Sequence, residues 1–270
     1  MSNKPYKGFE PKWLLTPAPA DSYRSIFRWG DPNFFKYPKE SLYTLMKEKF
    51  QMTDDDFKAY SDDTGFDPVE LPDHPVQLAA EHIEALKKIV GEQNVSTTDY
   101  DRLSVAYGAT AYDLLRLRHK RVDSVPDVVL YPETTEQVEQ IVAYSTEHHI
   151  PLYVYGGGSS VTRGVEPVKG GISLDMRRNF NKVISFNEID QTITVQAGMS
   201  GPDLEKTLQS APELFDAKRQ YTCGHFPQSF EYSSVGGWTV TRGAGQNSTY
   251  YGTIADIVLS QKYATPIGVI

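Results

Sequence analysis

Cysteine is almost absent from the sequence, since Cys223 is the single one among 270 residues. One cysteine cannot form a disulfide within the chain, which fits a reducing compartment better than an oxidising one. No apolar run reaches the length of about 18 residues that a membrane-spanning helix needs. The N-terminal stretch MSNKPYKGFEPKW also has no apolar segment typical of a signal peptide. We therefore expect a soluble, cytoplasmic protein.

Positive charge is also in short supply. The 27 lysine and arginine residues stand against 35 aspartate and glutamate residues, which gives a net charge of -8. Proteins that bind nucleic acids present a basic face to the phosphate backbone, so this balance argues against a nucleic-acid partner. It does not exclude a small phosphate-bearing ligand, because backbone amides bind an anion without a charged side chain.

The character of the sequence changes near residue 99, and we expect a separate region on each side. Residues 1–98 open with segments rich in proline, aspartate and aromatic residues, which predict an extended, partly helical arm. The strongest helix signal in this arm is PVQLAAEHIEALKKIVG (75–91), whose apolar residues recur at helical spacing before Gly91. Residues 99–270 have the alternating strand and helix patterns of a folded domain.

The second region begins with a strand, a helix and a strand. DVVLYP (127–132) is typical of a buried strand, TTEQVEQIVAYSTEHH (134–149) of an amphipathic helix, and IPLYVYGGG (150–158) of another strand. A strand–helix–strand unit of this length makes its two strands parallel. The glycines then lie past the carboxyl end of a parallel strand, where ligands of open α/β sheets bind.

The rest of the chain is richer in short strands and turns. Three β-rich segments cover 170–176, 182–187 and 191–198, and Ser200 is placed to cap a helix that follows. The final segment, DIVLSQKYATPIGVI (256–270), indicates a strand that enters a turn at TPIG, with its return strand cut off at Ile270. These patterns predict an α+β fold, and we expect the chain to be the N-terminal part of a longer protein.

The stretch YVYGGGSSVTRG (153–164) places three consecutive glycines directly after a strand. Glycine lets the backbone adopt positive φ angles and approach a ligand closely, and successive amides can then point at one anion. Ser159 and Ser160 add two hydroxyl groups. We give equal weight to two interpretations: a cradle for a pyrophosphate, and a tight connection that needs glycine for its geometry alone.

Two common nucleotide motifs are missing from this loop. It lacks the Lys-Ser/Thr ending of a P-loop, which argues against nucleotide hydrolysis, and it lacks the spacing of a nicotinamide-binding Rossmann fingerprint. A second cluster of small residues, GHFPQSFEYSSVGGWTVTRGAG (224–245), suits close backbone approach along a long, flat ligand. A dinucleotide with a tricyclic ring is such a ligand.

Taken in order, these motifs resemble the FAD-binding domain of the vanillyl-alcohol oxidase and p-cresol methylhydroxylase superfamily, over about residues 80–270. Within it, the chain most resembles the alkyldihydroxyacetonephosphate synthase family of ether-lipid enzymes. The stretch GHFPQSFEYSSVGGW is the most specific, and RWGDP (28–32) and QAGMSGPDLEKTLQ (196–209) add to it. The resemblance implies an FAD-binding domain of two α/β subdomains, incomplete at its C-terminal end, over residues 99–270.

The resemblance also implies three cofactor-binding segments. The first segment is Val154, Tyr155, Gly156, Gly157, Gly158, Ser159 and Ser160; the second is Gln228, Ser229, Phe230, Glu231, Tyr232, Ser233 and Ser234; the third is Thr241, Arg242, Gly243 and Ala244. Gln228 stands where an acidic residue is usual and Ser234 where threonine is usual, while Gly243 and Ala244 replace Ala-Ser. These changes keep small size or hydrogen-bonding ability, so FAD binding is still expected.

Some members of the superfamily attach FAD covalently through a histidine beside the glycine loop. This chain has Ser159 and Ser160 there, so the resemblance implies non-covalent FAD, and we expect no metal. For His225 and Cys223 we favour a structural role over flavin attachment or acid–base catalysis. Arg242 is equally suited to a phosphate and to a carboxylate partner, and Trp238 is expected to be a packing residue.

The implied activity is exchange of the acyl group of acyl-dihydroxyacetone phosphate for a fatty alcohol. The alternative is oxidation of a 2-hydroxy acid such as D-lactate or glycolate, and a third possibility is a binding module without catalysis. Catalytic residues are expected beyond Ile270, and none is assigned here. We expect a small-molecule substrate and a homodimer, and no basic amphipathic helix supports contact with a membrane surface.

Overall fold

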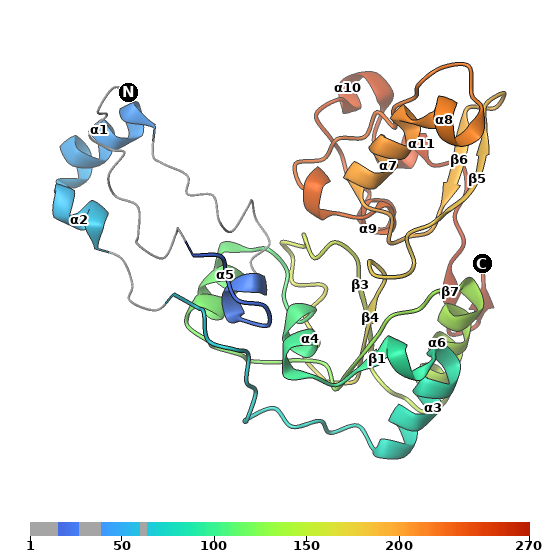
Figure 1. Ribbon diagram of the computed structural model, residues 1–270, viewed down its shortest axis with the longest axis horizontal. Coiled ribbons are helices and arrows are strands. Elements are labelled where there is room, and N and C mark those ends of the chain that lie inside the picture. Colours follow the sequence, from blue (N-terminus) through green and yellow to red (C-terminus); the bar gives the residue numbers. More distant parts are fainter. Residues whose placement is uncertain (1–15, 27–38, 60–63) are drawn as a thin grey trace. The chain divides into compact units, whose positions relative to one another are not determined.

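The computed structural model describes residues 16–26, 39–59 and 64–270, which divide into two compact units (Figure 1). The first unit comprises residues 1–69 and 114–121, and the second comprises residues 70–113 and 122–270. Helix α5 (Ala111–Arg118) contributes to both. The expected boundary between residues 98 and 99 stays a prediction.

The first unit contains short helices joined by hydrogen bonds between side chains. Its elements are η2 (Tyr23–Ile26), α1 (Glu40–Phe50) and α2 (Asp54–Lys58). Tyr43 on α1 is buried against Phe57 with ring centroids 5.0 Å apart, and its hydroxyl donates to the Asp54 carboxylate at 2.9 Å. Thr53 begins α2 with a capping box in which Asp56 is the reciprocal partner. The two helices therefore form one local hairpin.

The second unit is built on a mixed sheet of four strands in the order β1-β2-β4-β3. These strands are β1 (Val95–Ser96), β2 (Val128–Leu130), β3 (Leu152–Tyr155) and β4 (Ile172–Asp175). Strand β1 is antiparallel to β2, whereas β2 and β3 each run parallel to β4. The predicted parallel orientation of β2 and β3 is confirmed, but β4 lies between them. All four residues of β4 are buried, which suits a strand that has a neighbour on each side.

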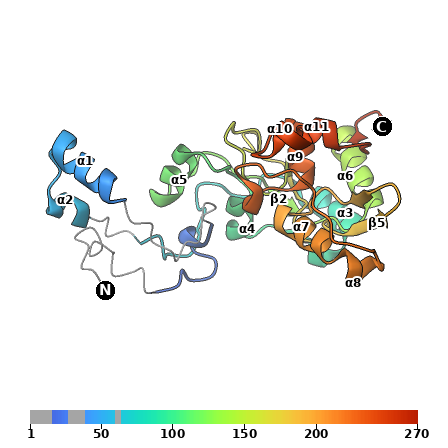
Figure 2. The same cartoon turned by 90° about the horizontal axis from the view of Figure 1, so that it is seen from above.

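Helices cover both faces of this sheet. On one face, α3 (Ala80–Val90) and α6 (Thr135–Glu147) lie side by side in both views (Figure 1, Figure 2). The apolar side chains of this face form one core. The core residues on these helices and strands are Leu86, Val90, Val128, Leu130, Ile141, Ile172 and Leu174. On the other face, Val105, which follows α4 (Asp99–Ser104), packs with Val129, Tyr131 and Tyr155. η3 (Glu92–Asn94) links α3 to β1.

A second layer follows the sheet in the chain. It consists of a hairpin of β5 (Val183–Asn187) and β6 (Thr192–Val195), followed by the short helices α7 (Gly201–Gln209), α8 (Ala211–Phe215), η4 (Phe230–Tyr232), α9 (Val235–Thr241), α10 (Ser248–Tyr251) and α11 (Ile254–Ile257). These elements surround their own core, to which Leu204, Trp238 and Ile254 belong. The Ser200 side chain accepts a hydrogen bond from the Asp203 backbone N–H at 3.1 Å, so the predicted cap of α7 is confirmed. The predicted α+β class is also confirmed.

The C-terminal segment differs from its prediction. Residues 254–257 form helix α11 where the beginning of a strand was expected at residue 256. The reason is a capping box in which Thr253 and Asp256 exchange hydrogen bonds and begin the helix. The expected turn at TPIG is present and joins the two-residue strands β7 (Ala264–Thr265) and β8 (Gly268–Val269). Among the described residues, no helix is long and apolar enough to span a membrane.

The central position of β4 leads to a test of core stability. Leu174 is 1% exposed, so Leu174→Ala should lower the free energy of unfolding by about 2–5 kcal/mol through lost packing and a residual cavity. Ile189, between β5 and β6, is 93% exposed, and Ile189→Ala should change the free energy of unfolding by less than about 0.5 kcal/mol. Urea unfolding followed by circular dichroism measures both. Equal losses in the two variants would contradict a core centred on β4.

Candidate functional site

The glycine loop, defined as residues 156–160, begins at the carboxyl end of β3. The sequence motif therefore lies where it was expected, past the end of a parallel strand. Gly158 has a φ of +73°, a left-handed conformation that a residue with a Cβ rarely adopts. Ser159 and Ser160 follow as half-buried residues, while Val154 before the loop is 58% exposed on the edge strand β3.

The first and second predicted segments are in direct contact. A Cβ on Gly157 would lie 1.9 Å from the carbonyl oxygen of Tyr232, and a Cβ on Gly156 would lie 2.4 Å from the hydroxyl oxygen of Ser234. No side chain fits at either position, so two of the glycines are required for close approach between two parts of the protein. The geometric interpretation of the loop thus holds for Gly156 and Gly157.

The serine hydroxyls of the second segment form hydrogen bonds within the protein. Ser233 is buried, donates to the Ser229 carbonyl at 2.7 Å and accepts from the Trp238 indole N–H at 2.6 Å. Ser234 is the N-cap of α9, and its hydroxyl accepts from the Gly237 N–H at 3.4 Å. Gln228 and Glu231 in the same segment are exposed. These serines therefore shape the segment from within the fold.

Aromatic rings pack against the second segment and against each other. Trp238 is buried, as expected of a packing residue, and its ring stacks with Phe230 at a centroid distance of 6.2 Å. The imidazole of His225 meets the edge of Trp238 at 4.9 Å. Burial holds the pKa of His225 below its ordinary value, and burial raises the pKa of the Cys223 thiol. Both groups are therefore neutral near pH 7, which agrees with the structural role that we favoured for them.

His225 is unusual because its side chain is fully buried and neither ring nitrogen has a hydrogen-bond partner among the described residues. A Cβ on Gly243 would lie 3.5 Å from Nε2 of this imidazole. Gly243 is the position where the resembled family has alanine, so the third segment lies directly against His225. Sequence reasoning alone did not find this contact.

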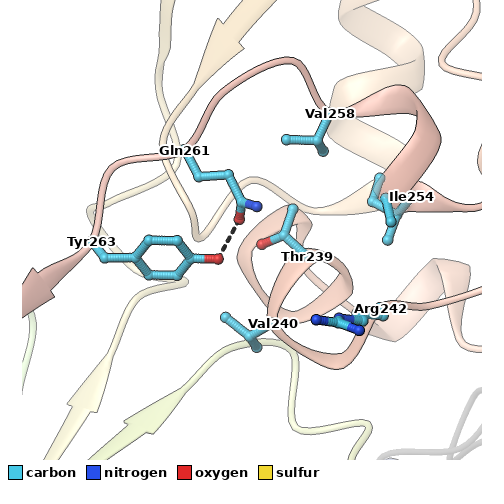
Figure 3. Close-up of a pocket in the computed structure, with 8 residues that line it drawn as sticks. Thr239, Val240, Arg242, Ile254, Val258, Gln261 and Tyr263 are labelled. Atoms are coloured by element: carbon cyan, nitrogen blue, oxygen red, sulfur yellow. Dashed lines mark hydrogen bonds between the residues drawn. The ribbon is translucent and has the colours of Figure 1, made fainter. Parts of the chain in front are cut away.

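The third segment begins at the last residue of α9 and borders a pocket of about 500 Å³ (Figure 3). Arg242 ends α9 with a φ of 53°, and the hydroxyl of Thr241 donates to the Gly237 carbonyl at 2.7 Å. The residues around the pocket are Thr239, Val240, Arg242, Ile254, Ala255, Val258, Gln261 and Tyr263. Tyr263 donates to the Gln261 side chain at 2.5 Å across one side of it. Of the three predicted segments, Arg242 alone reaches this pocket, and it supplies a cation beside an apolar wall.

Two further groups border the glycine loop, and sequence reasoning missed both. The segment Tyr107–Ala109 bonds to the end of the loop, where the Ala109 N–H donates to the Ser160 carbonyl at 2.8 Å. The side chain of Arg177 lies over the Tyr155 ring at 4.8 Å and pairs with Asp175. Gly108 was the sequence feature that could have indicated the segment Tyr107–Ala109, because a Cβ there would lie 2.2 Å from the Ser160 carbonyl oxygen. Nothing local in the sequence pointed to the second.

The side chains near the glycine loop include arginines and tyrosines. No group of three or more His, Cys, Asp or Glu side chains within the described ranges is arranged to hold a metal ion. Arg178 lies over the Tyr131 ring at 4.6 Å, and burial raises the pKa of Tyr131 above its usual range. This end of the sheet therefore offers amides, arginines and neutral tyrosines. The RWGDP motif (28–32) lies outside the described residues.

Known proteins are similar to this chain in sequence and fold. A family model described as an FAD binding domain matches residues 126–270. The alkyldihydroxyacetonephosphate synthase of Dictyostelium discoideum is 30% identical over 242 residues, which cover 88% of this chain and 38% of that protein. A solved structure of an alkyldihydroxyacetonephosphate synthase has 31% identity and a TM-score of 0.68, covering 75% of this chain and 35% of the other.

A relative with a different activity is also similar. The mitochondrial D-lactate dehydrogenase (cytochrome) 1 of Saccharomyces cerevisiae is 26% identical over 190 residues, which cover 70% of this chain and 30% of that protein. The chain thus spans less than two fifths of the length of each of these relatives.

The contact between Gly157 and Tyr232 can be tested by adding one methyl group. Gly157→Ala should lower the free energy of unfolding by about 1–3 kcal/mol, because the Cβ would overlap a backbone carbonyl. Gly164→Ala is the matched control, since nothing lies within 4 Å of a Cβ there, and it should leave stability unchanged or raise it by up to about 1 kcal/mol. Urea titration measures both. A stable Gly157→Ala variant would show that the loop does not contact residue 232.

The buried imidazole of His225 predicts a pH dependence. In the unfolded chain its pKa returns to about 6.5, whereas burial keeps the folded pKa lower, so the unfolded state binds the extra proton. Its contribution to stability is complete above pH about 6.5 and is lost as the pH falls toward the folded pKa. His225→Phe should therefore show a smaller loss of unfolding free energy between pH about 7.5 and about 5.5.

Chemical unfolding at several pH values measures this slope. A His225→Phe variant whose stability falls as steeply as that of the unchanged protein would contradict the prediction.

Proposed function

Because this chain belongs to the family of FAD binding domains that its motifs predicted, we propose that its three small-residue segments bind FAD without a covalent bond. The observation that carries the proposal is the contact between the glycine loop and residues 232–234 at the carboxyl end of the parallel strands. It brings two of the three segments to one place.

The residues of the loop fit the diphosphate of FAD. Three glycines allow its backbone to approach a ligand closely, Ser159 and Ser160 are half-buried hydroxyl donors, and the sequence from Val154 to Ser160 has no acidic residue. In this proposal the loop holds the diphosphate, and the backbone of residues 228–234 and 241–244 lines the rest of the dinucleotide. When bound, FAD supplies the chemistry of its ring, and the protein supplies binding and orientation.

The absence of a covalent bond is supported by the groups near the segments. The loop carries serines where a histidine would be needed, and the imidazole of His225 is fully buried beside Trp238. The thiol of Cys223 has a raised pKa, which leaves it protonated and a weak nucleophile.

For the activity, we propose that the chain is the FAD-binding part of an enzyme that exchanges the acyl group of acyl-dihydroxyacetone phosphate for a fatty alcohol. The 30% identity over 88% of this chain with an alkyldihydroxyacetonephosphate synthase supports this reading. The alternative, oxidation of a 2-hydroxy acid, is supported by the weaker similarity to a D-lactate dehydrogenase. A homodimer stays a prediction.

Flavin binding is the first test of the proposal. Adding the chain to FAD should quench the flavin fluorescence in a saturable way, and acid precipitation should release all flavin into the supernatant. Riboflavin, which lacks the diphosphate and the adenosine, should bind at least about tenfold more weakly if the loop binds the diphosphate. Equal binding of riboflavin and FAD, or flavin that stays with the precipitate, would contradict the proposal.

The two activities can be separated under anaerobic conditions with an FAD-loaded protein that also contains the catalytic residues expected beyond Ile270. Exchange of a labelled fatty alcohol into acyl-dihydroxyacetone phosphate, without loss of the visible absorbance of oxidised flavin, supports the synthase activity. Bleaching by D-lactate or glycolate supports the alternative and overturns the first assignment.

A further inference from the structure

We propose that Tyr155 is a positioning residue, which, together with the segment Tyr107–Ala109, holds the glycine loop in its ligand-binding shape. The inference rests on the proposed FAD site. It gives Tyr155 a role other than direct contact with the ligand. Tyr155 belongs to the first predicted segment, but its side chain is 1% exposed. It therefore acts on a bound ligand through the loop that it supports.

The loop is fastened at both ends to one short segment. At its beginning, the Tyr155 hydroxyl donates to the Tyr107 carbonyl at 3.2 Å in a buried hydrogen bond. At its end, the Ala109 N–H donates to the Ser160 carbonyl at 2.8 Å. Because the two anchor points are two residues apart in the chain, they fix the distance between the ends of the loop.

The Tyr155 hydroxyl also determines how the loop curves. A Cβ on Gly158 would lie 2.1 Å from this oxygen, and the φ of Gly158 is +73°. The backbone therefore bends closely over the hydroxyl at the one residue of the loop with a left-handed conformation. A turn of this kind aims successive amides into one concavity, which is the geometry that binds an anion.

The Tyr155 ring is itself held in place by an ion pair. Tyr155 and Asp175 are opposite each other in the register of β3 and β4. The Asp175 carboxylate is buried and accepts from Arg177 at Nε, 3.0 Å away, and at Nη2. This places the guanidinium 4.8 Å from the centre of the Tyr155 ring. A bidentate pair of this type fixes the arginine and, through it, one face of the tyrosine.

The supporting segment is equally well secured. Tyr107 and Ala109 are buried, and the Tyr107 hydroxyl accepts from the Asp123 N–H at 2.8 Å. A Cβ on Gly108 would lie 2.2 Å from the Ser160 oxygen, so the approach of this segment to the loop depends on glycine. The loop thus rests on a rigid support, as precise ligand geometry requires.

The test compares two tyrosine-to-phenylalanine variants in the same strand. Y155F removes the hydroxyl that bonds to Tyr107 and keeps the ring beneath Arg177. Y153F is the control, because the Tyr153 hydroxyl accepts one backbone N–H, that of Lys169 at 3.2 Å, away from the loop. The Kd for FAD, from flavin fluorescence, should rise about five- to tenfold in Y155F and less than about twofold in Y153F.

Hydrogen exchange without FAD gives a second readout that does not depend on the cofactor. The amides of residues 156–160 should exchange at least about fivefold faster in Y155F than in Y153F, whose loop should match the unchanged protein. Equal exchange in the two variants, or an equal rise in Kd, would mean that the hydroxyl has a general structural role, and would overturn the inference. If the unchanged chain binds no FAD, the proposed function fails, and the exchange data alone decide whether Tyr155 shapes the loop.

Discussion

The glycine loop and residues 232–234 approach each other so closely that no side chain fits between them, and this contact joins the two layers of the second unit. The loop continues strand β3 of the sheet, while residue 234 caps helix α9 of the second layer. Gly157 meets the Tyr232 carbonyl, and Gly156 meets the Ser234 hydroxyl. A ligand held by the loop is thus bound where the layers meet, and its binding energy stabilises both of them.

The serine hydroxyls of the second segment stabilise the fold, although the segment was predicted to bind the cofactor. Ser233 holds Trp238, and Ser234 begins α9, so their hydroxyls are engaged inside the protein. In the proposed function, an anion is bound by backbone amides of the glycine loop, with the half-buried Ser159 and Ser160 beside them. In the proposed function, such a site binds and orients the cofactor, and FAD supplies the chemistry.

The sequence allowed local features to be predicted, because each depends on neighbouring residues. The strands around helix α6, the Ser200 cap and the position of the glycine loop all follow from periodicity and turn chemistry. Strand order could not be inferred, because β4 enters between two strands that precede it in the chain. The start of α11 was missed because the apolar run after Asp256 outweighed the capping box at Thr253. The support beneath the loop depends on Tyr107, which is remote from the loop in sequence, so no local pattern predicted their contact.

The place of β4 in the sheet also has a consequence for biosynthesis. While the ribosome is still extending the chain toward residue 172, β2 has one partner, β1, and β3 has none. The hydrogen-bonding edges of β2 and β3 that face each other stay open until β4 emerges, and parallel pairing of this kind is slow. The parallel part of the sheet can therefore form only after residues 172–175 have been synthesised, and until then the unpaired strand edges are open to pairing with other chains.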